Sequence, residues 1–228
     1  MPGKITLSLA VTALISVVLA ALTMTGRFAA LDCSLAGALY ALRTPALTTT
    51  FKVITTAGEW YVYAAITLLL LALPKTRWNY GLPAGVALGA SAVLNALLKQ
   101  CFAIPRPTGH RLISETGFGF PSGHAMIGAA FVGLCTLVFV KYASRRGPEL
   151  AASVMAVLFM LAVGLSRVYL GVHNPSDIIA GYAMGLCCAL GIRGLIDLLP
   201  NPKNPHARDR HHLAQVGRRD NIPEKRRP

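Results

Sequence analysis

The sequence is poor in acidic residues, with nine Asp and Glu against 22 Lys and Arg in 228 residues. Charged residues of both signs make up only 14% of the chain, whereas a soluble domain carries about 25%. A shortage of surface charge is explained if most of the surface faces lipid. The carboxylates are also too scattered to form the oxygen cluster that holds Mg²⁺ or Ca²⁺. The sequence therefore predicts neither a soluble domain nor a bound metal or other cofactor.

Other features are missing as well. The five cysteines form no CxxC motif, so a structural disulfide or a zinc site is not supported: Cys33, Cys101, Cys135, Cys187 and Cys188. The chain has no tandem repeat, and its length fits one domain. A net charge of +13 is compatible with nucleic-acid binding, but no recognition module is present. Eight of the Lys and Arg residues instead follow Leu199 in a polar tail, as expected beside anionic lipid.

The sequence contains several long apolar runs without charged residues. Ile5–Thr25 contains 21 residues without a charge, enough to cross a bilayer and longer than the roughly 7–15 apolar residues of a signal peptide. Phe28–Arg43 is interrupted by Asp32 and Gly37 and is interpreted as a helix lying at the interface. Five further spans are predicted: Thr55–Leu73, Leu82–Phe102, Ser122–Val140, Leu150–Leu170 and Ser176–Leu199. We expect an all-α integral-membrane bundle of six transmembrane helices (residues 1–199) and a basic, flexible tail (residues 200–228).

The distribution of Lys and Arg predicts the orientation of this bundle. Six spans place both termini on one side, which also receives the loops around Lys75–Arg77 and Lys141–Arg146. That side holds 15 Lys and Arg residues and the other side holds seven. By the positive-inside rule, the termini are cytoplasmic in a cell-membrane protein. Loops 26–54, 103–121 and 171–175 then face outward.

Polar residues are concentrated in three segments that this topology brings to the outer face. Each segment lies where an odd-numbered span ends or an even-numbered span begins. The segments are Lys99 with Arg106-Pro107, Pro121-Ser122-Gly123-His124, and Ser166-Arg167 followed by His173 and Asp177. Three cations, two histidines and one carboxylate are therefore expected to meet.

This combination favours a phosphate ligand. Lys99, Arg106 and Arg167 supply positive charge, and the two guanidinium groups can hold phosphoryl oxygens in pairs. Ser122 and Gly123 stand at a helix start, where free backbone N–H groups attract an anion. Taken singly, Lys99 and Arg167 could extend from helix ends toward water, and Ser122 could be an ordinary N-cap.

The remaining polar groups supply a nucleophile and a proton donor. His173 and His124 can take these roles, and Asp177 can hold His173 in the tautomer that leaves one ring nitrogen free to attack. Asp177 can equally cap the sixth span through backbone amides, and the two interpretations are compatible.

These spacings resemble the three-part signature of the type 2 phosphatidic acid phosphatase family. The matching parts are Lys99-x6-Arg106-Pro107, Pro121-Ser122-Gly123-His124 and Ser166-Arg167-x5-His173-x3-Asp177. The resemblance implies that His173 is the nucleophile, His124 the general acid and Asp177 the orienting carboxylate. It also implies that Lys99, Arg106, Ser122, Gly123 and Arg167 bind phosphate, and that no metal is required. Vanadium haloperoxidases share the core but are soluble, which this apolar chain argues against.

The expected activity is hydrolysis of a lipid phosphate or diphosphate through a phospho-histidine. Undecaprenyl diphosphate, phosphatidylglycerophosphate and phosphatidic acid are all candidate substrates, with a slight preference for the polyprenyl carrier because the chain is compact and faces outward. Transfer of the phosphate to a lipid or sugar hydroxyl would use the same residues. A non-catalytic lipid binder or transporter is disfavoured, because transporters often carry repeats or broken helices at the midplane.

Several residues keep open interpretations. Glu59 is either functional or an interfacial carboxylate on the outer rim, and the second is favoured. His110, Arg111 and Glu115 can contact a head group or remain solvated in the outer loop. Gly85-x3-Gly89 and Gly181-x3-Gly185 predict close helix packing, either within one chain or in a homo-oligomer. The partners expected are the lipid substrate and membrane lipids.

Overall fold

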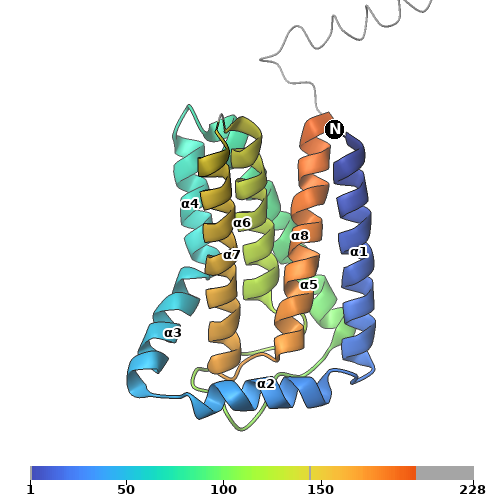
Figure 1. Ribbon diagram of the computed structural model, residues 1–228, viewed down its shortest axis with the longest axis vertical. Coiled ribbons are helices and arrows are strands. Elements are labelled where there is room, and N and C mark those ends of the chain that lie inside the picture. Colours follow the sequence, from blue (N-terminus) through green and yellow to red (C-terminus); the bar gives the residue numbers. More distant parts are fainter. Residues whose placement is uncertain (1, 144, 199–228) are drawn as a thin grey trace, which may run out of the picture. The chain divides into compact units, whose positions relative to one another are not determined.

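The computed structural model describes residues 2–143 and 145–198, which form eight α-helices and one π-helical turn and contain no strand. The predicted tail of residues 200–228 lies outside this description. The all-α class is confirmed. The helices, coloured along the chain in Figure 1, are α1 (Pro2–Met24), α2 (Ala29–Ala41), α3 (Pro45–Ala57), α4 (Trp60–Ala72), α5 (Leu82–Phe102), α6 (Gly123–Tyr142), α7 (Arg146–Tyr169) and α8 (Pro175–Leu198), with the π-helical turn at Arg77–Gly81.

Five described helices are long and apolar enough to cross a membrane: α1, α5, α6, α7 and α8. The α3–α4 pair makes a sixth span only if the two helices are counted together, because they meet at an angle of 44°. The membrane bundle is thus confirmed with five spans, or six when α3 and α4 are counted as one, and this second span differs from the expected Thr55–Leu73. Its first half begins at Pro45, where Thr44 accepts a hydrogen bond from the Leu47 backbone N–H at 3.1 Å.

The break inside the second span lies at Gly58 and Glu59. Glu59 adopts an extended backbone conformation (φ −75°, ψ 146°) and thereby ends one helix before the next begins. Gly58 lies directly against the Val163 side chain of α7, and a Cβ at Gly58 would come within 2.7 Å of Val163 Cγ1. A hydropathy window averages over the apolar residues around this break and does not resolve it, and the packing of Gly58 on Val163 arises only in the folded chain.

Helix α2 lies across one end of the bundle, where α7 ends and α8 begins (Figure 1). It is the expected interfacial helix, and its Ala36 packs with Val168 of α7 and Ile178 of α8. Asp32 is buried within this contact. Its two carboxylate oxygens accept from the Ser176 backbone N–H at 2.8 Å and from the Ser176 hydroxyl at 2.6 Å. Asp32 therefore caps the first turn of α8 from another helix.

The beginning of α1 and the end of α8 lie at the same end of the bundle. Ile5 Cγ2 would be 3.7 Å from a Cβ at Gly194, so the two helices are neighbours there. The opposite end gathers the last turns of α5 and α7 and the first turns of α6 and α8. The three polar segments of the sequence all lie at that end.

Small residues bring α6 and α8 into close contact. A Cβ at Gly185 would overlap the backbone carbonyl of Met126, and a Cβ at Gly181 would lie 2.9 Å from Ala125 Cβ. The Gly181-x3-Gly185 pair therefore packs within the chain. In the other pair, Gly85 approaches Thr67 of α4, whereas Gly89 has no atom within 4 Å of its added Cβ.

This difference predicts unequal effects of alanine. Gly185→Ala should push α6 and α8 apart and lower the free energy of unfolding by about 1–3 kcal/mol, the range for overpacked cores. Gly89→Ala is the matched control and should be neutral or stabilising by less than about 1 kcal/mol, since alanine favours a helix. Thermal unfolding of both variants in detergent measures the effect. Equal melting temperatures for the two variants would contradict this account of the packing.

Candidate active site

A cavity of about 270 Å³ opens among the polar segments at this end of the bundle. Six of the eight predicted site residues line it: Lys99, Arg106, Gly123, His124, Arg167 and His173. The other two lie directly behind it, where the Ser122 backbone N–H donates to the Asp177 backbone carbonyl at 3.2 Å. The structure therefore brings all eight residues together, from helices that are far apart in the sequence.

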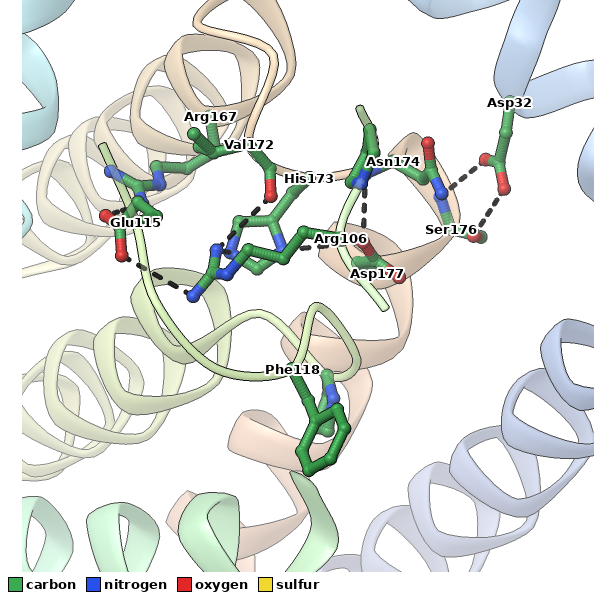
Figure 2. Close-up of polar contacts among 12 residues, drawn as sticks. Asp32, Arg106, Glu115, Phe118, Arg167, Val172, His173, Asn174, Ser176 and Asp177 are labelled. Atoms are coloured by element: carbon green, nitrogen blue, oxygen red, sulfur yellow. Dashed lines mark hydrogen bonds and ion pairs between the residues drawn. The ribbon is translucent and has the colours of Figure 1, made fainter. Parts of the chain in front are cut away.

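His173 lies in the short loop between α7 and α8 and is fully enclosed, with 1% of its surface exposed. Its Nδ1 is 3.4 Å from Asp177 Oδ2, and its Nε2 is 3.0 Å from Arg106 Nη1 (Figure 2). A guanidinium only donates, so Nε2 must be the acceptor and the ring proton must be on Nδ1. The geometry therefore selects the tautomer whose Nε2 carries the lone pair, which accepts the hydrogen bond from Arg106 at the lining of the cavity.

The surroundings also keep this imidazole neutral. Burial lowers the pKa of His173 well below the usual value, and the charges of Arg106, Arg167 and Lys99 lower it further. Because protonation would occupy the Nε2 lone pair, the lowered pKa favours the form of His173 that can act as a nucleophile.

Asp177 makes two contacts through one oxygen. Oδ2 accepts the Asn174 backbone N–H at 2.9 Å and faces His173 Nδ1. The carboxylate is thus both a cap of α8 and a neighbour of the imidazole, because the loop turns back over the first turn of the helix. Oδ1 is buried and makes no protein hydrogen bond.

Glu115 occupies the space between the two arginines. Its Oε2 lies 3.4 Å from Arg106 Nη2, and its Oε1 pairs with Arg167 Nη2 (Figure 2). Burial alone would raise the pKa of Glu115, but Arg167 and then Arg106 outweigh it and hold the pKa below its usual value. A carboxylate thus takes the guanidinium N–H groups that a phosphoryl group would require. In the sequence, Glu115 is one of several polar residues of a loop, and no motif indicates that it lies between the two arginines.

Neutralising Glu115 should therefore strengthen anion binding. We expect Glu115→Gln to lower the dissociation constant of orthovanadate about tenfold, because the variant amide competes less well than a carboxylate for both guanidinium groups. Titration calorimetry measures this binding without requiring turnover.

Glu149→Gln is the matched control for this titration. Glu149 lies in the first turn of α7, at the end of the helix opposite Arg167, and the change removes the same charge. The control should bind orthovanadate with the wild-type constant. An unchanged constant for Glu115→Gln would show that Glu115 does not compete with the anion.

The other phosphate-site candidates are held by the loop between α5 and α6. Lys99 donates to the Phe118 carbonyl at 2.6 Å, and the Asn95 amide donates to the Pro121 carbonyl at 3.3 Å. Ser122 is the N-cap residue of α6, but its hydroxyl makes no capping bond and is buried without a hydrogen-bond partner. This hydroxyl is therefore unpaired within the protein, behind the residues that line the cavity. Asn95 was missed by the sequence analysis, since one buried Asn in an apolar helix carries no motif.

Two residues of the α3–α4 pair complete the site. Arg167 Nη1 donates to Thr55 Oγ1 at 2.8 Å, which orients the guanidinium group from the side opposite Glu115. Glu59 Oε1 lies 3.2 Å from His124 Nε2, so the rim carboxylate of the sequence analysis contacts the candidate general acid. Both contacts depend on the break in the second span. Within residues 2–143 and 145–198, no group of three or more His, Cys, Asp or Glu is arranged to hold a metal ion.

Comparison with known proteins agrees with this geometry. The model of the PAP2 superfamily matches residues 80–197. Phosphatidylglycerophosphatase B of Bacillus subtilis (strain 168) is 34% identical over 125 residues, covering 53% of this chain and 59% of the relative. Undecaprenyl-diphosphatase of Sulfolobus acidocaldarius is 34% identical over 134 residues, covering 56% and 60%. The matched segment thus spans about 60% of the length of these curated relatives.

A solved structure extends the similarity to most of the fold. The crystal structure of a transmembrane PAP2-type phosphatidylglycerolphosphate phosphatase from Bacillus subtilis aligns with a TM-score of 0.76 at 26% identity. The alignment covers 86% of this chain and 98% of that chain.

Proposed function

Because the chain belongs to the PAP2 superfamily, we propose that it is a membrane phosphatase that hydrolyses a lipid phosphate or diphosphate through a phospho-histidine intermediate. The observation that carries the proposal is that His173 lines a cavity together with three cations, with Nε2 as the acceptor of a hydrogen bond from Arg106. Arg106 turns from Nε2 to the phosphoryl oxygens before Nε2 attacks. Three of the curated relatives, phosphatidylglycerophosphatase B, undecaprenyl-diphosphatase and dolichyldiphosphatase 1, are named for lipid phosphates or diphosphates, which supports this reaction class.

In the proposed first step, Nε2 of His173 attacks phosphorus and the bond from phosphorus to the leaving oxygen breaks. His124 gives its proton to that oxygen, so the lipid leaves protonated. Asp177 stabilises the positive charge that develops on His173. In the second step His124 takes a proton from water, the water oxygen bonds to phosphorus, and the phosphorus–nitrogen bond breaks to return His173.

The phosphoryl oxygens need positive charge throughout both steps. Arg106 and Arg167 can each offer two N–H groups once Glu115 moves aside, and Lys99 adds a third charge. Ser122 supplies its free hydroxyl and Gly123 its helix-start position, where a Cβ would lie 3.3 Å from Asn95 Oδ1. These groups stabilise the transition state electrostatically, and the proposal requires no metal ion.

The proposed orientation follows the distribution of Lys and Arg. Both termini are cytoplasmic, and the cavity opens at the outer face of the cell membrane, where it takes lipid phosphates from the outer leaflet. A protease added to sealed right-side-out vesicles should leave the tail of residues 200–228 intact. Removal of the tail under these conditions would reverse the orientation.

Phosphate release from a panel of lipid phosphates tests the activity. The panel holds phosphatidic acid, phosphatidylglycerophosphate and undecaprenyl diphosphate, each assayed with purified protein and excess chelator. Release of inorganic phosphate from at least one lipid supports the proposal, whereas inactivity on all three contradicts it. Loss of activity only with the chelator would contradict metal independence. Phosphate recovered solely on an added hydroxyl acceptor would establish transfer in place of hydrolysis.

A further inference from the structure

Glu59 is the one carboxylate of the cavity that faces a candidate proton donor, and the proposed reaction gives it no role. It stands at the break between α3 and α4 with 27% of its side chain exposed, and its Oε1 lies 3.2 Å from His124 Nε2. Gly58 fixes this position by packing on Val163 of α7. Glu59 is therefore held beside His124 by the fold and is not a loosely solvated rim residue.

We propose that Glu59 is a specificity-determining residue that selects lipid phosphate monoesters over lipid diphosphates. The inference rests on the proposed function, because it concerns the leaving group of that reaction. His124 must approach the oxygen that leaves, so the carboxylate touching His124 is also close to that oxygen. The chemistry of the leaving group then decides how it interacts with Glu59.

The first argument is charge. A monoester leaves as a neutral alcohol, whereas a diphosphate leaves as a second phosphate that is itself an anion. Placing that anion next to Glu59 brings like charges together, which disfavours the diphosphate. Arg167 is the cation close enough to act on Glu59, and it belongs to the candidate site for the transferred phosphoryl group, so it does not serve a second phosphate.

The second argument is the supply of cations. Among the described residues that line the cavity, the permanently charged cations are Lys99, Arg106 and Arg167. All three belong to the candidate site for the transferred phosphoryl group, where Glu115 already pairs with the two arginines. A second phosphate would find no cation of its own.

The third argument is proton demand. An alkoxide is strongly basic, so breaking a monoester needs full protonation of the leaving oxygen by His124. A departing phosphate is a much weaker base and needs this proton far less. A carboxylate 3.2 Å from His124 Nε2 can hold the imidazole in place for this proton transfer. Glu59 thus helps the monoester reaction while its charge opposes the diphosphate reaction, and both effects favour the same substrate class.

The slight preference of the sequence analysis for a polyprenyl diphosphate is replaced by this inference. Phytanyl phosphate and phytanyl diphosphate test it, because the two lipids share one saturated chain. Initial rates are measured with the purified full chain in mixed micelles, following the first lipid product of each. We expect kcat/KM of the wild type to be at least about tenfold higher for the monophosphate.

Glu59→Gln should reduce this preference about tenfold, by slowing monoester hydrolysis and relieving the repulsion of the diphosphate. Glu59→Asp keeps the charge and should retain most of the preference. Glu149→Gln makes the same change in the first turn of α7, away from the cavity. It should leave the ratio of monophosphate to diphosphate kcat/KM at its wild-type value.

Each outcome has a distinct meaning. A wild type that cleaves phytanyl diphosphate as fast as the monophosphate would overturn the monoester assignment while leaving the phosphatase intact. An unchanged ratio in Glu59→Gln would overturn the role of Glu59. If the protein released phosphate neither from the two phytanyl lipids nor from the three lipids of the panel, the proposed function itself would be overturned. If Glu59→Gln does not fold, the wild-type ratio and Glu59→Asp still decide the inference.

Discussion

Replacing His173 by alanine should reduce phosphate release by about 10⁵–10⁶-fold, the loss typical of a deleted nucleophile. In the proposed reaction Nε2 of His173 is the attacking nitrogen; it lies at the cavity, where Arg106 Nη1 contacts it at 3.0 Å. Without this nitrogen the proposed covalent intermediate is not formed. Rapid-quench experiments with ³²P-labelled substrate should trap a phosphoenzyme in the wild type and none in the variant.

The matched control for this experiment is His110→Ala. His110 is an exposed histidine of the α5–α6 loop that stacks on Tyr40, with ring centroids 4.9 Å apart. It does not line the cavity, so the variant should keep its kcat and its phosphoenzyme. Wild-type turnover in His173→Ala, or a phosphoenzyme that survives in it, would refute covalent catalysis by His173.

The second large effect is expected at His124. His124→Gln removes a proton donor but keeps a polar side chain of similar reach. We expect kcat for an alkyl phosphate to fall about 10²–10⁴-fold, the usual contribution of general acid catalysis. The loss should be much smaller for p-nitrophenyl phosphate, because nitrophenolate leaves without protonation. Comparing the two substrates therefore separates proton donation from binding.

A phosphoenzyme assay sharpens the interpretation of His124→Gln. With p-nitrophenyl phosphate the variant should still form the intermediate, because His173 is untouched, but hydrolysis should slow since His124 also activates water. The intermediate should therefore accumulate. Equal losses on both substrates, with no accumulation, would assign His124 to binding and not to proton transfer.

The sequence predicted the helices and the gathering of the polar segments because both follow from strong local signals. Long uncharged runs such as Ile5–Thr25 indicate transmembrane helices in a chain this apolar. Because successive spans cross the membrane in opposite directions, the end of one span and the start of the next lie on the same face. Lys99, Ser122 and Asp177 could thus be placed at one end of the bundle without coordinates. The roles of these residues stay predictions, to be decided by the variants above.

The sequence could not predict features that arise only from contact between helices. At the break in the second span, Gly58 packs against Val163, which lies more than a hundred residues later, and no hydropathy window links the two. Glu115 was indistinguishable from a solvated loop residue because its partners, Arg106 and Arg167, come together only in the folded chain. Asp32 interrupted an apolar run, and only the structure shows Ser176 as its partner.

Helix α2, which lies across the end of the bundle, also affects which part of the chain can be separated without disrupting the site. The family-matched segment begins at residue 80, yet groups before that point complete the site: Asp32 caps α8 through Ser176, and Thr55 orients Arg167. Arg43 similarly joins the end of α7 to the loop between α5 and α6, donating to the carbonyls of Tyr169 at 2.6 Å and His110 at 2.8 Å. Cutting the chain at residue 80 would strand these buried polar groups. The smallest transplantable catalytic unit therefore includes residues 29–59.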